Sequence, residues 1–472
     1  MKKTKIVATI GPASYNEQVL HDMIMEGVDV CRLNFSHGTH EEYRKVIENV
    51  RKINKSYNRH TAILADLQGP KLRIGEVENG KIELETGKEI VLTNVKTPGT
   101  IKKLYISYPQ LPSDTVPGAQ ILIDDGKIVL EVIDSDGKKE VRTKIIQGGW
   151  LTAKKGVNLP DTKISLPCLT QKDLIDLEFA LEQEVEWIAL SFVRSGEDIK
   201  EIKKQIKDRG KTTKVIAKIE KPQALHDIDA ILKEADGLMV ARGDLGVEIP
   251  LQDVPIIQKQ LVIKCREASK PVIIATQMME SMIDNITPTR AEVNDVANAV
   301  MDGADAVMLS AETSLGNHPV EVIKMFNKII KKSETFGGIY YHYNTPDPNN
   351  KRFISDSICY NATKLAERVE AKAIITMSFS GYTGHKISSF RPNANTFIFT
   401  ANRSILNSLS LIWGVKGYFY NKFISTDDTI LDIIDILKKE DAIKTGDLII
   451  NIASIPISDK GESNMLKLSR VK

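Results

Sequence analysis

Eight short apolar segments recur along the first 313 residues of the chain, and the stretches between many of them carry apolar residues at helical spacing. Eight strand and helix units in one run predict an α/β fold of the (β/α)8 TIM-barrel type. A doubly wound parallel sheet is the alternative, because the number of strands does not prove that a sheet closes on itself. The predicted strands cover residues 5–10, 29–36, 61–68, 187–193, 214–220, 237–244, 271–276 and 306–313.

Helices are expected over residues 14–26, 171–184, 255–269 and 288–302. The last of these is expected to begin at Pro288, with Thr287 as its cap. A threonine cap followed by proline in the first turn is a common helix start.

One connection in this series is much longer than the others. More than a hundred residues separate Gln68 from Trp187, and over residues 75–167 the apolar residues alternate with polar ones. Asp125 and Gly126 suit a tight hairpin turn within this region. The pattern predicts an inserted β-barrel domain over the carboxyl ends of the barrel strands, where a mobile lid would sit. An insert that serves only stability is the alternative.

A second α/β unit follows the barrel. Residues 340–350 are polar and rich in turn formers, as in a linker, and strands are expected over 371–378, 396–400, 416–421 and 447–454. A doubly wound sheet fits this order, with residues 465–471 as an edge strand. The predicted division is a barrel of residues 1–74 and 168–339, a lid domain of 75–167 and a C-terminal α/β domain of 351–472.

Charge and cysteine usage exclude several classes of protein. Lysine and arginine number 64 against 62 acidic residues, so the chain as a whole has no basic surface for nucleic acid or an anionic membrane. The four cysteines stand apart, without the spacing of a zinc site or a disulfide framework. The N-terminal apolar run is too short for a signal peptide. These features predict a reduced, cytoplasmic protein.

Charged residues gather where the fifth and sixth predicted strands end. Side chains alternate along a strand, so Lys218 and Glu220 are expected on the same face, with Asp244 at the equivalent end of the next strand. Two carboxylates beside a lysine predict a Mg²⁺ site for a phosphorylated or carboxylate ligand. A structural ion pair at the barrel mouth is the alternative.

Other predicted strand ends are polar as well, in the segments RLNFSHG (32–38), ADLQGPKLR (65–73) and SAET (310–313). Barrel enzymes draw their catalytic groups from several strand ends, so this distribution favours a site over scattered surface polarity. Singly, Arg32 or Asp66 could equally belong to a structural ion pair.

These segments occur together with further motifs along nearly the whole chain. KIVATIGPAS, RLNFSHG, DLQGPKLR, KKGVNLP, KIEKPQ, MVARGDLG and MLSAET, in this order, closely resemble the pyruvate kinase family. The resemblance implies phosphoryl transfer from phosphoenolpyruvate to ADP, giving pyruvate and ATP in the last step of glycolysis. It also implies Mg²⁺ or Mn²⁺ as cofactor, a regulatory C-terminal domain and a homotetramer.

The resemblance further implies roles for residues at these motifs. Lys218 and Arg32 are expected beside the transferring phosphoryl group, and Thr313 near the carbon that receives a proton. Lys218, Arg32 and Thr313 are therefore the expected catalytic residues. A threonine is too weak an acid to donate that proton, so it is expected to order a water relay.

Binding roles follow in the same way. Glu220 and Asp244 are expected to hold the divalent cation, and the main chain around Ala241, Gly243 and Asp244 to bind the substrate carboxylate. The expected nucleotide contacts are Asn34, Ser36, His37, Arg73 and, from the lid side, Lys155.

One departure from the family pattern concerns K⁺. Many members hold K⁺ with residues that match Asn34, Ser36, Asp66 and the carbonyl of Leu67, and carry glutamate where this chain has Lys71. A lysine ammonium and K⁺ at neighbouring positions would repel each other strongly, so we expect them to be mutually exclusive. Leu67 and Gln68 also resemble the K⁺-independent branch, and K⁺ is therefore not expected to be required.

A loop in the C-terminal domain resembles the family's site for a sugar-phosphate effector. It comprises Ser378, Ser380, Gly381, Tyr382 and Thr383. A turn with hydroxyl groups and glycine before a helix can bind phosphate, although an ordinary helix cap is the more common reason for such a sequence. Gly384 stands where alanine is common in relatives.

Two other functions remain open at this point. A Mg²⁺-dependent aldolase or lyase acting on a pyruvate enolate could also use Glu220 and Asp244, but Arg73, Lys155 and the insert argue for a nucleotide. A catalytically inactive metabolite sensor would not need the set of Lys218, the two carboxylates and Thr313.

Overall fold

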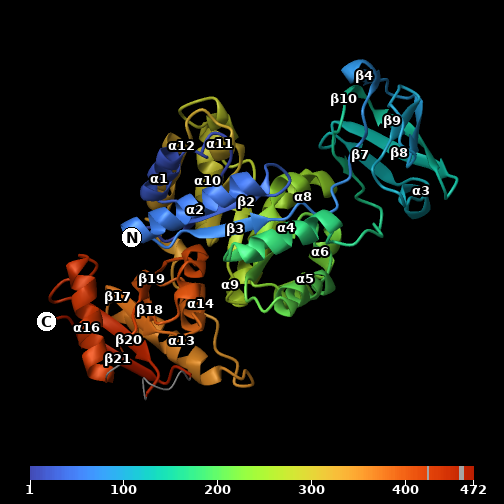
Figure 1. The fold of residues 1–472 in the computed structure, drawn as a ribbon. Coiled ribbons are helices and arrows are strands. Elements are labelled where there is room, and N and C mark those ends of the chain that lie inside the picture. The colour runs from blue at the N-terminus through green and yellow to red at the C-terminus, as the bar shows by residue number, and fades with distance from the viewer. Residues whose placement is uncertain (423–424, 456–461) are drawn as a thin grey trace.

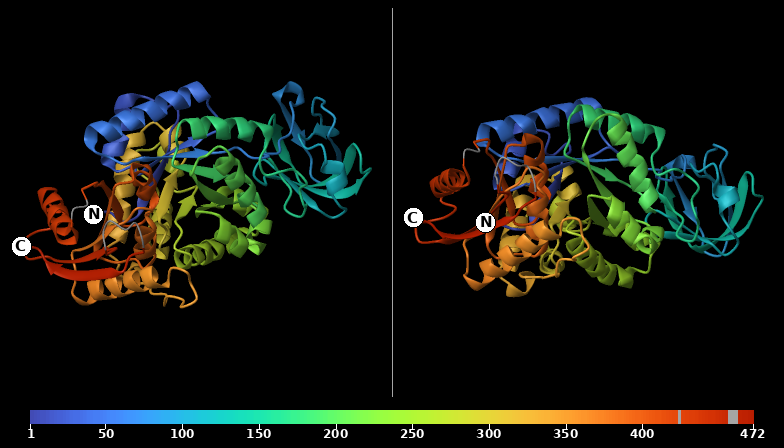
Figure 2. Two further views of the ribbon diagram at one scale, coloured as in Figure 1. Left: turned by 60° about the horizontal axis from the view of Figure 1, so that its bottom comes forward. Right: turned by 90° about the horizontal axis from the view of Figure 1, so that it is seen from below.

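The structure of the chain is a computed structural model that describes residues 1–422, 425–455 and 462–472. Three bodies follow one another across the molecule (Figure 1). The barrel lies in the middle, and the all-β insert and the C-terminal α/β domain lie at opposite ends of it (Figure 2). No described helix is both long and apolar enough to cross a membrane.

The barrel is closed, which decides against the doubly wound alternative. Its strands run in the order β1-β16-β15-β14-β13-β12-β3-β2, and every neighbouring pair is parallel. The strands are β1 Lys5–Thr9, β2 Val30–Asn34, β3 Ala62–Asp66, β12 Trp187–Leu190, β13 Lys214–Ile219, β14 Gly237–Ala241, β15 Val272–Ala275 and β16 Ala306–Leu309. Each overlaps one of the eight predicted segments, so that prediction is confirmed.

Helices follow the barrel strands and cover them from outside (Figure 1). Their apolar side chains and those of the strands form one large buried cluster. The barrel helices are α1 Glu17–Glu26, α2 His40–Tyr57, α4 Gln171–Glu182, α5 Gly196–Asp208, α6 Pro222–His226, α7 Ile228–Glu234, α8 Arg242–Glu248, α9 Val254–Glu267, α10 Arg290–Asp302, α11 Ala311–Ser314 and α12 Pro319–Ser333.

The helix predicted over residues 288–302 starts later than expected, so its predicted start and cap were wrong. Helix α10 begins at Arg290 and is capped by Thr289, not by Thr287. The Thr289 hydroxyl accepts from the Glu292 N–H, and the Glu292 carboxylate accepts from the Thr289 N–H at 2.7 Å. This reciprocal pair satisfies two N–H groups at once, and Thr287 has no acidic residue at the matching position.

The insert leaves the barrel after β3 and has a hydrophobic core of its own. A six-stranded sheet in the order β11-β7-β8-β9-β5-β6 and a smaller pair of β10 and β4 make up its strands. The hairpin between β7 and β8 turns through Asp124, Asp125 and Gly126, all with positive φ, as the sequence predicted. The elements are β4 Lys81–Leu84, β5 Glu89–Thr93, β6 Lys103–Tyr105, α3 Leu111–Asp114, β7 Gln120–Ile123, β8 Ile128–Ser135, β9 Glu140–Gln147, β10 Gly149–Thr152 and β11 Val157–Asn158.

The C-terminal domain is a five-stranded sheet in the order β19-β18-β17-β20-β21. The first four strands are parallel, and β21 is the antiparallel edge strand that the sequence predicted. The domain packs against the amino ends of the barrel strands, where Lys5 Nζ donates to the Val415 carbonyl at 2.8 Å. Its elements are α13 Phe353–Arg368, β17 Ala373–Met377, α14 Tyr382–Ser389, β18 Asn395–Thr400, α15 Arg403–Leu406, β19 Val415–Phe419, α16 Thr426–Lys439, β20 Leu448–Ala453 and β21 Met465–Arg470.

Candidate active site

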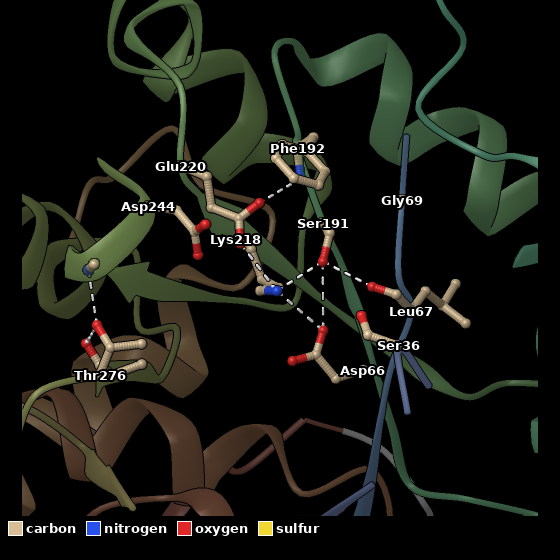
Figure 3. A network of polar contacts seen from close by, with 12 residues as sticks. Ser36, Asp66, Leu67, Gly69, Ser191, Phe192, Lys218, Glu220, Asp244 and Thr276 are labelled. Atoms are coloured by element: carbon tan, nitrogen blue, oxygen red, sulfur yellow. Dashed lines mark hydrogen bonds and ion pairs between the residues drawn. The ribbon is translucent and has the colours of Figure 1, made fainter. Parts of the chain in front are cut away.

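Lys218 stands at the centre of a polar cluster at the carboxyl ends of the barrel strands (Figure 3). Its Nζ lies 2.9 Å from Glu220 Oε1 and 3.2 Å from Asp66 Oδ1, and donates to Ser191 Oγ at 2.7 Å. Glu220 is held in place because its other oxygen accepts from the Phe192 N–H at 2.7 Å. As expected, Lys218 and Glu220 point to the same side.

The electrostatics keep this lysine charged. Burial on its own lowers the pKa of Lys218, but the carboxylates of Asp66 and Glu220 outweigh burial and raise it. Burial likewise raises the pKa of Asp66, but Lys218 and Arg32 reverse that effect and lower it. The cluster therefore presents an ammonium group that retains its proton over the physiological pH range.

Arg32 joins the same cluster through Asp66. Its Nε donates to Asp66 Oδ2 at 2.7 Å, and its Nη1 donates to the Thr9 hydroxyl at 2.8 Å. Asp66 is thus shared between the guanidinium of Arg32 and the ammonium of Lys218. The two cations lie close together because one buried carboxylate is bonded to both.

Asp244 lies elsewhere than predicted. It belongs to the first turn of α8, because β14 already ends at Ala241. Its carboxylate nevertheless lies on the same side of Lys218 as that of Glu220 (Figure 3). Burial raises the pKa of Glu220; Lys218 opposes the rise and the charge of Asp244 adds to it.

This donor set fits a hard divalent cation. The Asp244 side chain is 35% exposed, and its nearest ionic partner, Lys71 Nζ, is 3.9 Å away. Within the described ranges no group of three or more histidine, cysteine, aspartate or glutamate residues could hold a metal. Mg²⁺ commonly uses one or two protein carboxylates and completes its shell with substrate oxygens and water. Glu220 and Asp244 meet that description.

Two residues in this region were missed by the sequence analysis. Thr276 follows β15, and its hydroxyl accepts from the Gly243 N–H at 2.8 Å. Its φ is +70°, which is rare for a β-branched residue, and the Arg242 guanidinium donates to its carbonyl at 2.7 Å. Ser191 is the other. Both residues lie in segments that were predicted as strands. A hydroxyl at the strand end is the one signal that marks them in the sequence, and the contacts that make them important are with other elements.

Thr313 is placed less favourably than the resemblance implied. It is fully buried, and its hydroxyl donates to the Thr9 carbonyl at 2.9 Å. The hydroxyl is therefore engaged within the barrel wall. Its suggested role beside the reacting carbon stays a prediction.

The expected nucleotide residues lie in two groups. Asn34 ends β2, and Ser36 and His37 follow it. The Asn34 side-chain oxygen accepts from the Ser36 N–H at 3.2 Å. Burial lowers the pKa of His37, and Arg73 and then Lys71 lower it further, which places these three side chains near one another.

Lys155 lies apart from these residues. Its Nζ pairs with Asp124 Oδ1 at 2.9 Å inside the insert. Arg73 also turns toward the insert, since its Nη1 donates to the Lys154 carbonyl at 3.0 Å. The structure thus pairs Lys155 within the insert, and its proposed contact with a nucleotide stays a prediction.

The expected monovalent-cation residues are occupied by internal contacts. The Leu67 carbonyl accepts from the Ser191 hydroxyl at 2.7 Å, and Asp66 is bonded to Arg32 and Lys218. Lys71 directs its ammonium toward Asp244. A positive charge is therefore already present on this side of the site.

The predicted effector loop caps helix α14. Gly381 has φ +79°, and its N–H donates to Ser378 Oγ at 3.0 Å. Tyr382 donates its hydroxyl to Asp356 Oδ1 at 2.6 Å, and Thr383 Oγ1 lies 3.4 Å from Ser463 Oγ. The Tyr382 N–H donates to Ser380 Oγ at 3.4 Å.

A closed parallel barrel with a charged lysine, two nearby carboxylates and a β domain over the strand ends is typical of enzymes that act on anionic substrates. Two family models match this chain: "Pyruvate kinase, barrel domain" over residues 1–323 and "Pyruvate kinase, alpha/beta domain" over residues 356–469. The chain belongs to the pyruvate kinase family.

Individual relatives agree with this assignment. A pyruvate kinase of Geobacillus stearothermophilus is 42% identical and aligns with 99% of this chain and 80% of its own length. One of Clostridium perfringens is 40% identical over the full length of both chains. The crystal structure of a pyruvate kinase from Cryptosporidium parvum has a TM-score of 0.92 at 35% identity, covering 100% of this chain and 96% of its own.

Proposed function

We propose that this protein transfers the phosphoryl group of phosphoenolpyruvate to ADP, giving pyruvate and ATP as the last step of glycolysis. The observation that carries the proposal is the Lys218 ammonium, fixed by Asp66, Glu220 and Ser191 beside Asp244. Full-length relatives with this activity in their names support it.

Lys218 and Arg32 are proposed to stabilise the phosphoryl group during transfer. Both are positive, and both are oriented by Asp66 before any substrate arrives. Charges that are already oriented stabilise developing negative charge without reorganisation at the moment of reaction. The guanidinium fork of Arg32 also matches the geometry of phosphate oxygens.

Glu220 and Asp244 are the proposed ligands of Mg²⁺ or Mn²⁺. A metal bound there would supply Lewis-acid charge to the oxygen atoms of the substrate. Asp244 keeps its carboxylate partly open to solvent, which leaves room for that ion.

The substrate carboxylate is proposed to lie at the start of α8. Ala241 ends β14 and precedes α8, and Gly243 and Asp244 lie in the first turn of that helix, where negative charge is favoured. The Thr276 hydroxyl accepts from the Gly243 N–H at 2.8 Å and donates to the Ala275 carbonyl at 2.6 Å, so it supports the start of α8 beside this position.

ADP is proposed to bind near His37 and Arg73, with Asn34, Ser36 and Lys155 as further contacts. Lys155 would then exchange its ion pair with Asp124, which lies in the insert as well, for a phosphate group, and movement of the insert would carry Lys155 toward that phosphate. We therefore propose a lid of residues 75–167 on a barrel of 1–74 and 168–339, with a regulatory domain of 351–472. Closure of such a lid would exclude water and limit hydrolysis.

The proposal also covers regulation and assembly. The loop 378–383 would bind a sugar-phosphate effector, since its N–H groups begin helix α14. Exposed apolar residues on and beside α9, namely Leu251, Ile256 and Ile263, support burial against further copies of the chain in a homotetramer. Four buried free cysteines are consistent with a reducing cytoplasm.

A coupled assay tests the activity directly. ATP formation should require phosphoenolpyruvate, ADP and a divalent cation together. A Mg²⁺-dependent aldolase would instead cleave or form carbon–carbon bonds without ADP, and that result with no ATP formed would contradict the proposal.

A further inference from the structure

Helix α8 connects the catalytic cluster to the insert. Its first turn carries Gly243 and Asp244, and its last residue is Glu248. The Glu248 side chain is 1% exposed, and Glu248 is not one of the residues expected to bind substrate. A buried carboxylate of this kind requires partners to be stable.

Both partners of Glu248 bind the same oxygen atom. Oε1 forms an ion pair with Lys221 Nζ and accepts from Asn158 Nδ2 at 2.7 Å. The other oxygen, Oε2, is buried and has no hydrogen-bond partner within the part of the chain that the structure covers. The carboxylate is therefore held from one side only.

The two partners come from different bodies of the molecule. Lys221 directly follows Glu220 after β13, so it is part of the barrel. Asn158 lies in β11 of the insert, where it is paired with Leu122 of β7. Because Asn158 is fixed in that sheet, its bond to Glu248 attaches the sheet to the last residue of α8.

The hairpin between β7 and β8 faces α8 at the same place. An added Cβ at Gly126 would lie 3.9 Å from Val247 Cγ1, which is an ordinary van der Waals distance. A cleft between the two bodies opens nearby and is lined by Asn158, Lys221 and Asp244. Asn158 and the hairpin of the insert thus both face the end of α8.

We propose that Glu248 is a positioning residue that couples the position of the insert to the first turn of α8. When the insert moves, the hydrogen bond from Asn158 displaces Glu248. This residue is the last of α8, a helix of only seven residues. A rigid helix transmits that displacement to Gly243 and Asp244. The proposal rests on the proposed function of the insert as a lid. It adds that the Glu248 side chain transmits a change in lid position to the active site.

Asn158 is the residue to change, because it is half-buried at the seam and its loss leaves the buried ion pair intact. Asn158→Ala removes the hydrogen bond, and Asn158→Asp places a second carboxylate against Glu248. We expect kcat to fall about tenfold in Asn158→Ala, as for loss of one charge-assisted hydrogen bond, and further in Asn158→Asp. The KM for phosphoenolpyruvate should rise more than the KM for ADP, because Gly243 and Asp244 in the first turn of α8 are proposed to hold the phosphoenolpyruvate carboxylate and the metal.

Hydrogen exchange gives a readout that does not depend on turnover. Amides of residues 242–248 should exchange several-fold faster in both variants. Asn94→Ala is the matched control, because Asn94 Nδ2 also makes hydrogen bonds, at 2.7 and 3.0 Å, but only to Pro109 and Lys138 within the insert. It should leave exchange at 242–248 unchanged.

The outcomes separate this proposal from the proposed function. If both Asn158 variants leave exchange at 242–248 and kcat at wild-type values, the coupling through Glu248 is refuted, whatever the enzyme catalyses. If exchange rises while the wild-type protein forms no ATP, the coupling stands and the proposed activity fails.

Discussion

The side chains of the catalytic cluster are expected to have different roles. Asp66 binds the two cationic side chains, Arg32 and Lys218, whereas the carboxylates of Glu220 and Asp244 lie together on one side of Lys218. We expect Lys218→Met to lower kcat by several orders of magnitude and to change the KM for phosphoenolpyruvate little, since the ammonium is needed chiefly during transfer. Steady-state kinetics measure both.

The matched control is Lys214→Met, which removes a partly buried lysine from the other end of the same strand. It should retain most of kcat. Equal turnover in Lys218→Met and the wild type would remove Lys218 from the proposed mechanism.

The two carboxylates are expected to respond differently from the lysine. Glu220→Gln and Asp244→Asn each remove a ligand charge, so the Mg²⁺ concentration for half-maximal rate should rise at least about tenfold in both. Titration of activity with Mg²⁺ measures the change. Unaltered Mg²⁺ dependence in both variants would exclude the pair as the metal site.

Lys71 provides a test of the monovalent-cation prediction. Its ammonium lies 3.9 Å from Asp244 Oδ1, and a K⁺ ion nearby would be repelled. The wild-type enzyme is expected to be active without Na⁺ or K⁺, and Lys71→Glu is expected to gain dependence on K⁺. Rates are compared at constant ionic strength with a bulky organic cation. Strong activation of the wild type by K⁺ would falsify the proposal.

At the scale of elements, the strands were predictable because a buried parallel strand is a short apolar run with turn residues on either side. Lys218 and Glu220 were predictable from alternation along one strand. Thr276 and Asn158 were not, because their importance depends on contacts with Gly243 and Glu248 on another element. The sequence likewise could not show that Asp244 sits in a helix rather than at a strand end.

Packing around helix α14 explains why this chain has glycine at position 384, where alanine is common in relatives. A Cβ at Gly384 would lie 2.0 Å from Cδ1 of Ile398 in β18. We expect Gly384→Ala to lower the free energy of unfolding by about 1–3 kcal/mol through overpacking, despite the better helix propensity of alanine. Thermal or denaturant unfolding measures the loss.

Ile398→Val removes the clashing methyl and serves as the partner substitution. Alone it should cost about 0.5–1.5 kcal/mol, as other buried Ile→Val changes do. Combined with Gly384→Ala it should restore stability above that of Gly384→Ala alone. Simple additivity of the two losses would show that the close approach is not what excludes alanine.

For the whole molecule, strand β13 links the C-terminal domain to the catalytic cluster. Its carboxyl end carries Lys218, and at its amino end Lys214 Nζ lies 3.2 Å from Nε2 of His385 in α14. Helix α14 begins at the proposed effector loop. The contact between Lys214 and His385 therefore joins the strand that carries Lys218 to the helix that begins at the proposed effector loop. Protonation at this contact between the barrel and the C-terminal domain affects the free energy of unfolding.

His385 makes the stability of this contact between the two domains depend on pH. Burial lowers the pKa of His385 well below its usual 6.5, and the neighbouring charges of Lys214 and Lys270 lower it further. Below pH 6.5 the His385 side chain binds a proton in the unfolded chain but not in the folded chain. The free energy of unfolding therefore decreases as the pH decreases. The slope for one such group is at most about 1.4 kcal/mol per pH unit. His385→Gln should therefore lose less stability than the wild type between pH 6.5 and 5, and the exposed His226→Gln should match the wild type. Parallel pH curves of unfolding for wild type and His385→Gln would show that this histidine is not what makes the interface acid-sensitive.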